Sequence, residues 1–213
     1  MAKKKRKKPK GNSRKMLGVY RAVTFVYYGL YLTVVGFLVG VVGSGIACGS
    51  INSGSSGGFS TGMNIVRAAG IMIPAGAVLG FVGRIMSLDC PEDFSGKKLI
   101  YGAVFFDVIV ITLRVMSWFT TLRPIVETLS QLSNLAATIL FLVFLKQVAQ
   151  YIHDAKSEGS AANVLKIGLG VFVSMLLGIF LPPLFLLAIL LLLIGFLAYI
   201  MLLIRLRESL QTA

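Results

Sequence analysis

The chain has 213 residues, of which 56% are hydrophobic and only 14% are charged, and its formal net charge is +13. A soluble domain of this size is far less apolar, so the composition leaves no room for a soluble catalytic domain. With only two cysteines, Cys48 and Cys90, the chain has neither a disulfide framework nor a Cys-x-x-Cys zinc site.

The N-terminal segment, residues 1–21, is strongly basic and holds ten of the 21 Lys and Arg residues. Blocks of like charge repel, so we expect this segment to be a disordered cytoplasmic tail. It is also expected to contact anionic lipid headgroups, through Lys3, Lys4, Lys5, Arg6, Lys7, Lys8 and Lys10. Nuclear import or nucleic-acid binding is the alternative, but a basic run beside an apolar segment is first a topology signal.

The apolar pattern after this tail predicts an all-α, polytopic membrane protein whose transmembrane domain covers residues 22–206. About 20 apolar residues cross the hydrocarbon core, and the chain offers about six such segments. The stretch at 49–62, between the first two, is almost all Gly and Ser and is expected to be a flexible loop. The predicted spans are 22–43, 63–86, 99–122, 125–151, 162–181 and 184–204.

Polar and proline-containing segments are expected to separate the later spans. Arg123-Pro124 is predicted to form a turn, and residues 153–160 a polar link. Pro182-Pro183 interrupts a long uncharged run, and because two prolines remove two backbone donors, we expect a hairpin there. The C-terminal residues 207–213 are predicted to be a short cytoplasmic tail.

The distribution of basic residues predicts which side of the membrane each end faces. With a cytoplasmic N-terminus and six spans, 18 of the 21 basic residues fall on the inner side. The positive-inside rule therefore favours two cytoplasmic termini in a plasma membrane or bacterial inner membrane.

Small residues recur on one face of each of the first two predicted spans. Close approach at glycine lets membrane helices associate, so these faces are predicted to pack on each other or on a second copy. The predicted packing residues are Gly29, Gly36, Gly40 and Gly43, followed by Gly76, Gly80 and Gly83.

Polar side chains at membrane depth are the candidate functional residues. Asp107 and Arg114 lie seven residues apart on one face of the third span, about 10 Å apart along the axis, so each needs another partner. An ionisable group inside a span is a functional candidate because leaving it unpaired is costly. The proposed network combines these two with Tyr27, Tyr31, Glu127, Gln131, Asn134 and Thr138.

Two functions fit this pattern. In the first, the polar groups hold together a small structural or accessory membrane protein, which forms a homo-oligomer or binds a membrane-protein partner. In the second, they line a path for an ion, a proton or a small solute. Asp107 is the only deep carboxylate, and proton-coupled paths use chains of such groups, which favours the first.

The sequence favours no enzyme, metal or cofactor. The one histidine, His153, lies at the predicted inner end of the fourth span, away from the Ser-rich outer loop. An intramembrane aspartyl protease needs two facing carboxylates. The expected surroundings are therefore the lipid bilayer and other membrane helices.

Overall fold

The computed structural model describes residues 16–53, 56–91, 94–117, 119, 121–178, 181 and 183–212. All its regular elements are helices: α1 (Leu17–Ser53), α2 (Ser56–Met86), α3 (Lys97–Met116), α4 (Arg123–Tyr151), α5 (Ala155–Gly178) and α6 (Pro183–Thr212). For these residues the all-α prediction is confirmed. Five helices, α1 to α4 and α6, are long and apolar enough to cross a membrane. A crossing by α5 stays a prediction.

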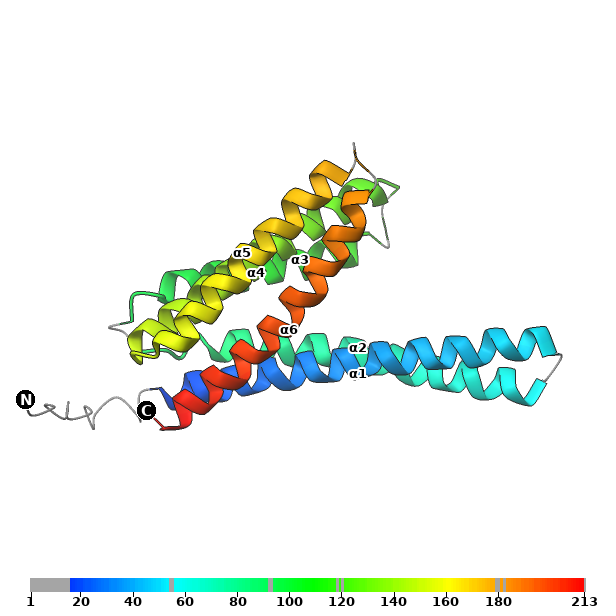
Figure 1. The fold of residues 1–213 in the computed structure, drawn as a ribbon, viewed down its shortest axis with the longest axis horizontal. Helices are drawn as coiled ribbons and strands as arrows, with labels where there is room; N and C mark the ends of the chain where they lie inside the picture. The colour runs from blue at the N-terminus through cyan, green and yellow to red at the C-terminus, as the bar shows by residue number, and fades with distance from the viewer. Residues whose placement is uncertain are drawn as a thin grey trace, which may run out of the picture.

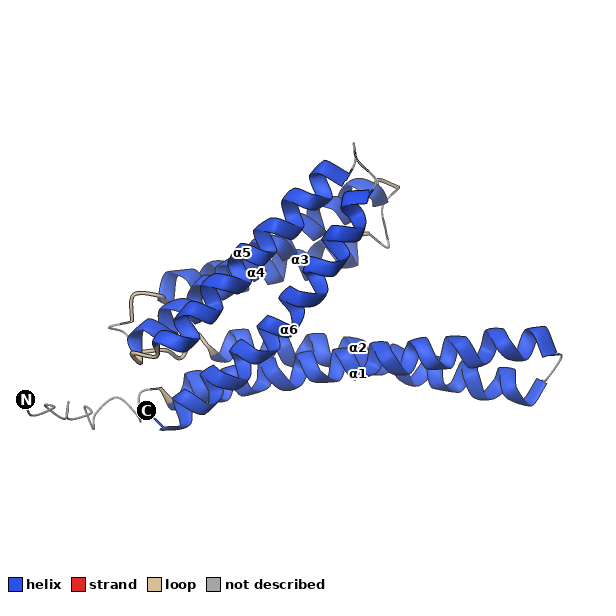
Figure 2. Ribbon diagram, in the orientation of Figure 1, coloured by secondary structure: helices blue, strands red, loops and turns tan. Residues whose placement is uncertain are grey.

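The helices form two arms that join at one end and diverge at the other (Figure 1). The first arm is the α1–α2 hairpin, and the second contains α3, α4 and α5. Helix α6 starts beside α5 and crosses to the first arm, where it contacts α1. The loops drawn in Figure 2 lie at the ends of the helices. The start of α1, the end of α6 and the α2–α3 and α4–α5 connections share the joined end.

The α1–α2 hairpin is held by small residues that recur every seven positions. Such a repeat keeps one seam of each helix facing its partner. A Cβ atom placed on Gly29 would lie 2.6 Å from the carbonyl oxygen of Gly76, so the two backbones are in direct contact. The buried small residues are Ala22, Gly29, Gly36, Gly43 and Ser50 in α1, and Gly62, Ala69, Gly76 and Gly83 in α2.

The predicted loop at 49–62 is wrong, because α1 continues to Ser53 and α2 starts at Ser56. Gly and Ser have weak intrinsic helix propensity, but tertiary packing overrides it here. The seven-residue seam extends into this stretch, where Ser50 and Gly62 are buried. The Ser50 hydroxyl also donates to the carbonyl oxygen of Ile46, one turn earlier in the same helix, at 2.7 Å. The hydroxyl therefore has its hydrogen-bond partner within α1.

The third and fourth helices differ from their predicted spans at the α3–α4 connection. Helix α3 ends at Met116 instead of residue 122. There the Ser117 amide donates to the carbonyl of Leu113 (2.9 Å) and the Ser117 hydroxyl to that of Arg114 (2.7 Å), which closes the last turn. Arg123 was predicted to lie in a turn, but it is the first residue of α4. Pro124 comes next, and proline is favoured in the first turn of a helix.

Helix α5 begins inside the predicted polar link at 153–160, because Asp154 caps it. The Asp154 carboxylate accepts hydrogen bonds from the amide and hydroxyl of Ser157, at 3.3 and 2.5 Å, and from the hydroxyl of Ser209 in α6 at 2.6 Å. Burial raises the pKa of Asp154, but the hydrogen bonds from the two hydroxyls and from backbone amides outweigh burial and hold that pKa below its usual value. Helix α6 continues to Thr212, through the predicted tail.

The hydrophobic core lies at the joined end of the two arms. Phe141 and Phe144 of α4 are almost fully buried, together with Leu202 and Leu206 of α6. The Phe94 ring, from the α2–α3 connection, packs edge-on against Phe144 with 5.7 Å between centroids. In α1 the buried residues after Val26 are all Gly, Ala or Ser. Among the described residues, the distal part of the hairpin therefore has no core of large side chains.

Candidate functional site: a polar cavity between the arms

An ion pair links the two arms near the core. Arg84, in the last turn of α2, donates from Nη1 to Oδ1 of Asp107 in α3 at 2.6 Å. The two side chains are only 17% and 11% exposed. The Arg84 guanidinium also lies over the ring of Phe141, 5.0 Å from its centroid, which adds a cation–π contact. The partner of Asp107 therefore comes from α2, and Arg84 is not among the residues of the first and fourth spans that the proposed network combined with Asp107.

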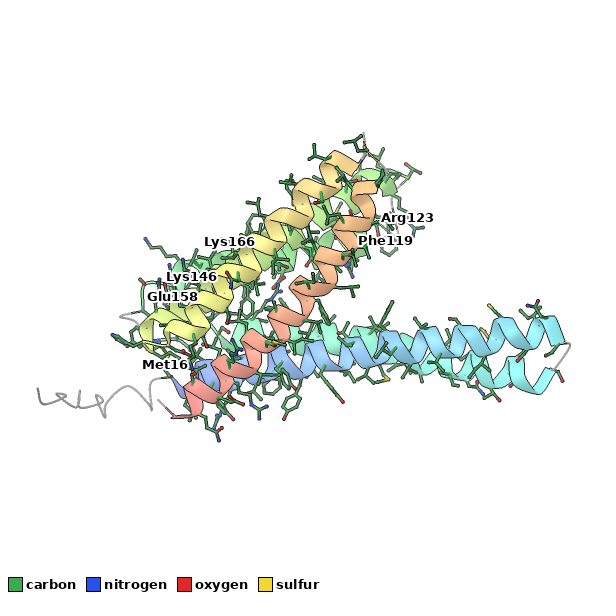
Figure 3. The ribbon with its side chains drawn as sticks, in the orientation of Figure 1. Met16, Phe119, Arg123, Lys146, Glu158 and Lys166 are labelled. Atoms are coloured by element: carbon green, nitrogen blue, oxygen red, sulfur yellow. The ribbon has the colours of Figure 1, made fainter. Side chains whose placement is uncertain are left out.

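The proposed network of eight polar residues is not brought together. On α4, Glu127 pairs with Arg123 at 2.7 Å, and both side chains are at least half exposed. Figure 3 shows Arg123 at the diverging end of the second arm. Gln131 is exposed, and the Thr138 hydroxyl donates within its own helix, to the carbonyl of Asn134 at 2.8 Å.

The two predicted tyrosines also lie elsewhere. Tyr27 packs against the core, and the guanidinium of Arg207 lies 5.8 Å from its ring centroid. Tyr31 is 60% exposed. A different tyrosine, Tyr199 of α6, lines the space beside Asp107.

That space is a cavity of about 340 Å³ between the arms. Its apolar wall includes Val26, Leu30, Val78, Phe81, Val110 and Ile111. Its polar wall consists of Thr33, Arg84, Asp107, Arg114, Asn134 and Tyr199. Asp107, Arg114 and Asn134 thus line one space, although no hydrogen bond or ion pair joins the side chains of these three described residues.

Two polar groups in this cavity lack a partner among the described residues. The Oδ2 atom of Asp107 is buried and accepts no hydrogen bond. Arg114 is exposed, and neither of the two ion pairs among the described residues includes it. Unsatisfied buried polar atoms are few in folded proteins, and each needs an explanation.

The predicted packing glycines differ in how closely they face the other helix of the hairpin. A Cβ atom on Gly36, Gly43, Gly76 or Gly83 would lie within 3.0 Å of the facing helix, whereas one on Gly40 would lie 3.3 Å from the Cβ of Ala69. A Cβ atom on Gly80 would meet nothing within 4 Å, because Gly80 lines the cavity. The predicted lipid contacts, Lys3 to Lys10, lie outside the described residues.

Arg84 and Tyr199 were missed by the sequence reasoning. Arg84 lies two residues from the end of the second predicted span and was one of the 18 basic residues assigned to the inner side. A signal was present, because Gly76, Gly80 and Arg84 follow one another at intervals of four and therefore share a helix face. For Tyr199 the sequence carries no comparable signal.

Comparison of the chain with protein-family models, with curated proteins and with solved structures found no match. Five of the described helices are compatible in length and composition with an integral membrane protein.

Proposed function

We propose that this protein is a structural or accessory component of a small membrane assembly, and that it binds its partner through the tip of the α1–α2 hairpin. We define the hairpin tip as residues 44–53 and 56–66. The partner is a second copy of the chain or another membrane protein. The observation that carries the proposal is the exposed apolar surface of this tip.

The length of the hairpin supports a tip outside the hydrocarbon core. The 37 residues of α1 extend about 55 Å at 1.5 Å per residue, whereas the core is about 30 Å thick. On α2, Arg67 and Arg84 are 17 residues apart, or about 26 Å. Two arginines at this separation fit the two faces of the core, and the hairpin tip then extends beyond it.

Large apolar side chains are exposed on this tip. Ile46, Ile51, Phe59 and Met63 are 38%, 64%, 42% and 36% exposed. Lipid would cover such residues in the hydrocarbon core, but beyond the core they mark a site for another protein. The tip has no charged residue, so the matching surface on the partner is expected to be apolar.

We propose further that the joined end is cytoplasmic, in a plasma membrane or bacterial inner membrane. Figure 3 places Met16 and Glu158 toward this end. Helix α3, which starts with Lys97 and Lys98, and helix α5, whose second residue is Lys156, also begin here. The positive-inside rule supports this orientation, with the hairpin tip on the outer side.

Photo-crosslinking from Cys48 tests the proposal in native membranes. Cys48 is exposed on the hairpin tip, and Cys90 is buried, so a benzophenone maleimide attaches selectively to Cys48. We expect a discrete protein adduct, whose mass tells a second 22.9 kDa chain from another partner. The control is Thr112→Cys, on an exposed face of α3, in a Cys48→Ser background. Absence of a Cys48 adduct, or the same adduct from both positions, would reject the proposal.

A further inference from the structure

We propose that the cavity between the arms is a binding site for a small monoanion, a carboxylate or a phosphate, that also carries a hydrogen-bond donor. This inference concerns Asp107, Arg84 and Arg114, and it is independent of the hairpin tip. It rests on the charge of the cavity, on one unpartnered oxygen and on the volume.

The charge of the cavity selects an anion. Its wall holds two arginines and one carboxylate, so one positive charge is left over. Asp107 is engaged by Arg84 at 2.6 Å. Arg114 lies seven residues away on the same helix, about 10 Å along the axis, too far for a simple contact with Asp107.

Arg114 is suited to bind that anion. Guanidinium groups bind carboxylates and phosphates through two parallel hydrogen bonds. The side-chain amide of Asn134 also lines the cavity and can donate to the same group. A zwitterion would leave the excess positive charge in place, whereas a monoanion removes it.

The unpartnered oxygen of Asp107 favours a ligand that carries a hydrogen-bond donor. Oδ1 accepts from Arg84, but Oδ2 is buried and accepts from no described residue. Asp107 as a whole is only 9% exposed and lines the cavity. A hydroxyl or N–H group on the ligand would complete the hydrogen bonds of this carboxylate.

The volume limits the ligand to a small molecule or a lipid headgroup. About 340 Å³ lies at the lower end of the range of roughly 300 to 1,000 Å³ for small-molecule sites. Leu30, Phe81 and Ile111 supply apolar walls. A free hydroxy acid and a phosphatidylglycerol headgroup share the required chemistry, an acid with a hydroxyl donor.

Thermal unfolding of the purified full-length protein in detergent tests the proposal. The soluble probes are lactate and propionate, which differ by one hydroxyl, and the lipid probes are phosphatidylglycerol and phosphatidylcholine. We expect lactate or phosphatidylglycerol to raise the melting temperature, with an affinity at least tenfold above that of its matched control. A lactate effect indicates a soluble ligand, and an effect of phosphatidylglycerol alone indicates a headgroup.

Two glycine variants show whether the ligand occupies the cavity. A Cβ atom on Gly80 points into open space in the cavity, and one on Gly70 into open space elsewhere on α2. Gly80→Met should fill the cavity and abolish the shift, whereas Gly70→Met should keep it. If Gly80→Met fails to fold, Arg114→Gln replaces it, because Arg114 is exposed and its loss should weaken the affinity at least tenfold.

The proposal is overturned if neither lactate nor phosphatidylglycerol stabilises the protein, or if each acts equally on wild type and on the cavity variant. Equal effects of lactate and propionate, with no effect of phosphatidylglycerol, would also reject it, because Asp107 would then receive no donor. Crosslinking from Cys48 should be unchanged in Gly80→Met, so failure here and failure of the assembly role are distinguishable.

Discussion

The ion pair between Arg84 and Asp107 should be the most sensitive polar contact in the molecule. Asp107→Asn keeps the size of the side chain but removes its charge, which leaves the Arg84 guanidinium uncompensated beside an apolar wall. Arg84→Gln leaves the carboxylate in the same position. Both side chains are more than four-fifths buried, so water in the adjacent cavity can replace only part of the missing partner.

The expected loss follows from this burial. Removing one partner of a buried ion pair costs about 3 to 5 kcal/mol, and the residual exposure of 17% and 11% places each variant near about 3 kcal/mol. Independent effects would give about 6 kcal/mol for the double variant, but a coupling of about 3 kcal/mol between residues in contact reduces the loss to about that of one single variant. Each single variant should melt roughly 6 to 12 °C below wild type.

The assay is thermal unfolding of the four proteins in one detergent, analysed as a double-mutant cycle for Arg84 and Asp107. Arg123→Gln is the matched control, because it breaks the exposed pair with Glu127 and should cost only about 0.3 to 0.5 kcal/mol. A double variant of Arg84 and Asp107 that loses the sum of the two single effects would contradict a buried, coupled ion pair. So would an Asp107→Asn variant as mild as the control.

Three further outcomes are expected. Gly29→Leu should destabilise the hairpin in thermal unfolding, because its Cβ would lie 2.6 Å from the α2 backbone. A Cβ on Gly70 meets nothing within 4 Å, so Gly70→Leu should be harmless in the same assay. Equal effects of the two variants would count against the small-residue seam. An impermeant maleimide on intact cells should label Cys48. Burial, which also raises the pKa of the Cys90 thiol, should keep Cys90 slow to react even after solubilisation. Labelling of Cys48 only after the cells are permeabilised would reverse the proposed orientation. The pKa of Asp154 is lowered in the folded protein, so ionised Asp154 stabilises the fold above the unfolded-state pKa of about 4. This contribution is lost as the pH falls through the lower folded-state pKa. The melting temperature of Asp154→Ala should therefore depend less on pH, between neutral and acid pH, than that of wild type.

The helical class and the centres of the helices could be predicted because they depend on local apolar runs. The proline pair marks a real boundary, since α6 begins at Pro183. The tip was missed because Gly and Ser were read by their loop preference alone. The seven-residue seam through Gly43, Ser50 and Gly62 was visible in the sequence and outweighs that preference once two helices pair.

The candidate site was only partly predictable. Asp107 and Arg114 stood out because charge is rare inside an apolar helix, and both line the cavity. The partner of Asp107 depends on how the last turn of α2 meets α3, which is a tertiary feature. Sequence spacing places groups on one face of one helix, but it does not tell which neighbouring helix supplies Arg84 or Tyr199.

The assembly role is tested most directly by the mass of the protein purified in mild detergent, measured by size-exclusion chromatography with light scattering. Gly45 lies in the hairpin tip with open space beside it, so Gly45→Leu should fold normally yet obstruct a bound partner. The assembly role predicts that wild type elutes as a complex heavier than one 22.9 kDa chain, and that Gly45→Leu elutes as a single chain with an unchanged melting temperature. A wild-type protein that elutes as a single chain, or a Gly45→Leu variant that assembles as wild type does, would contradict it.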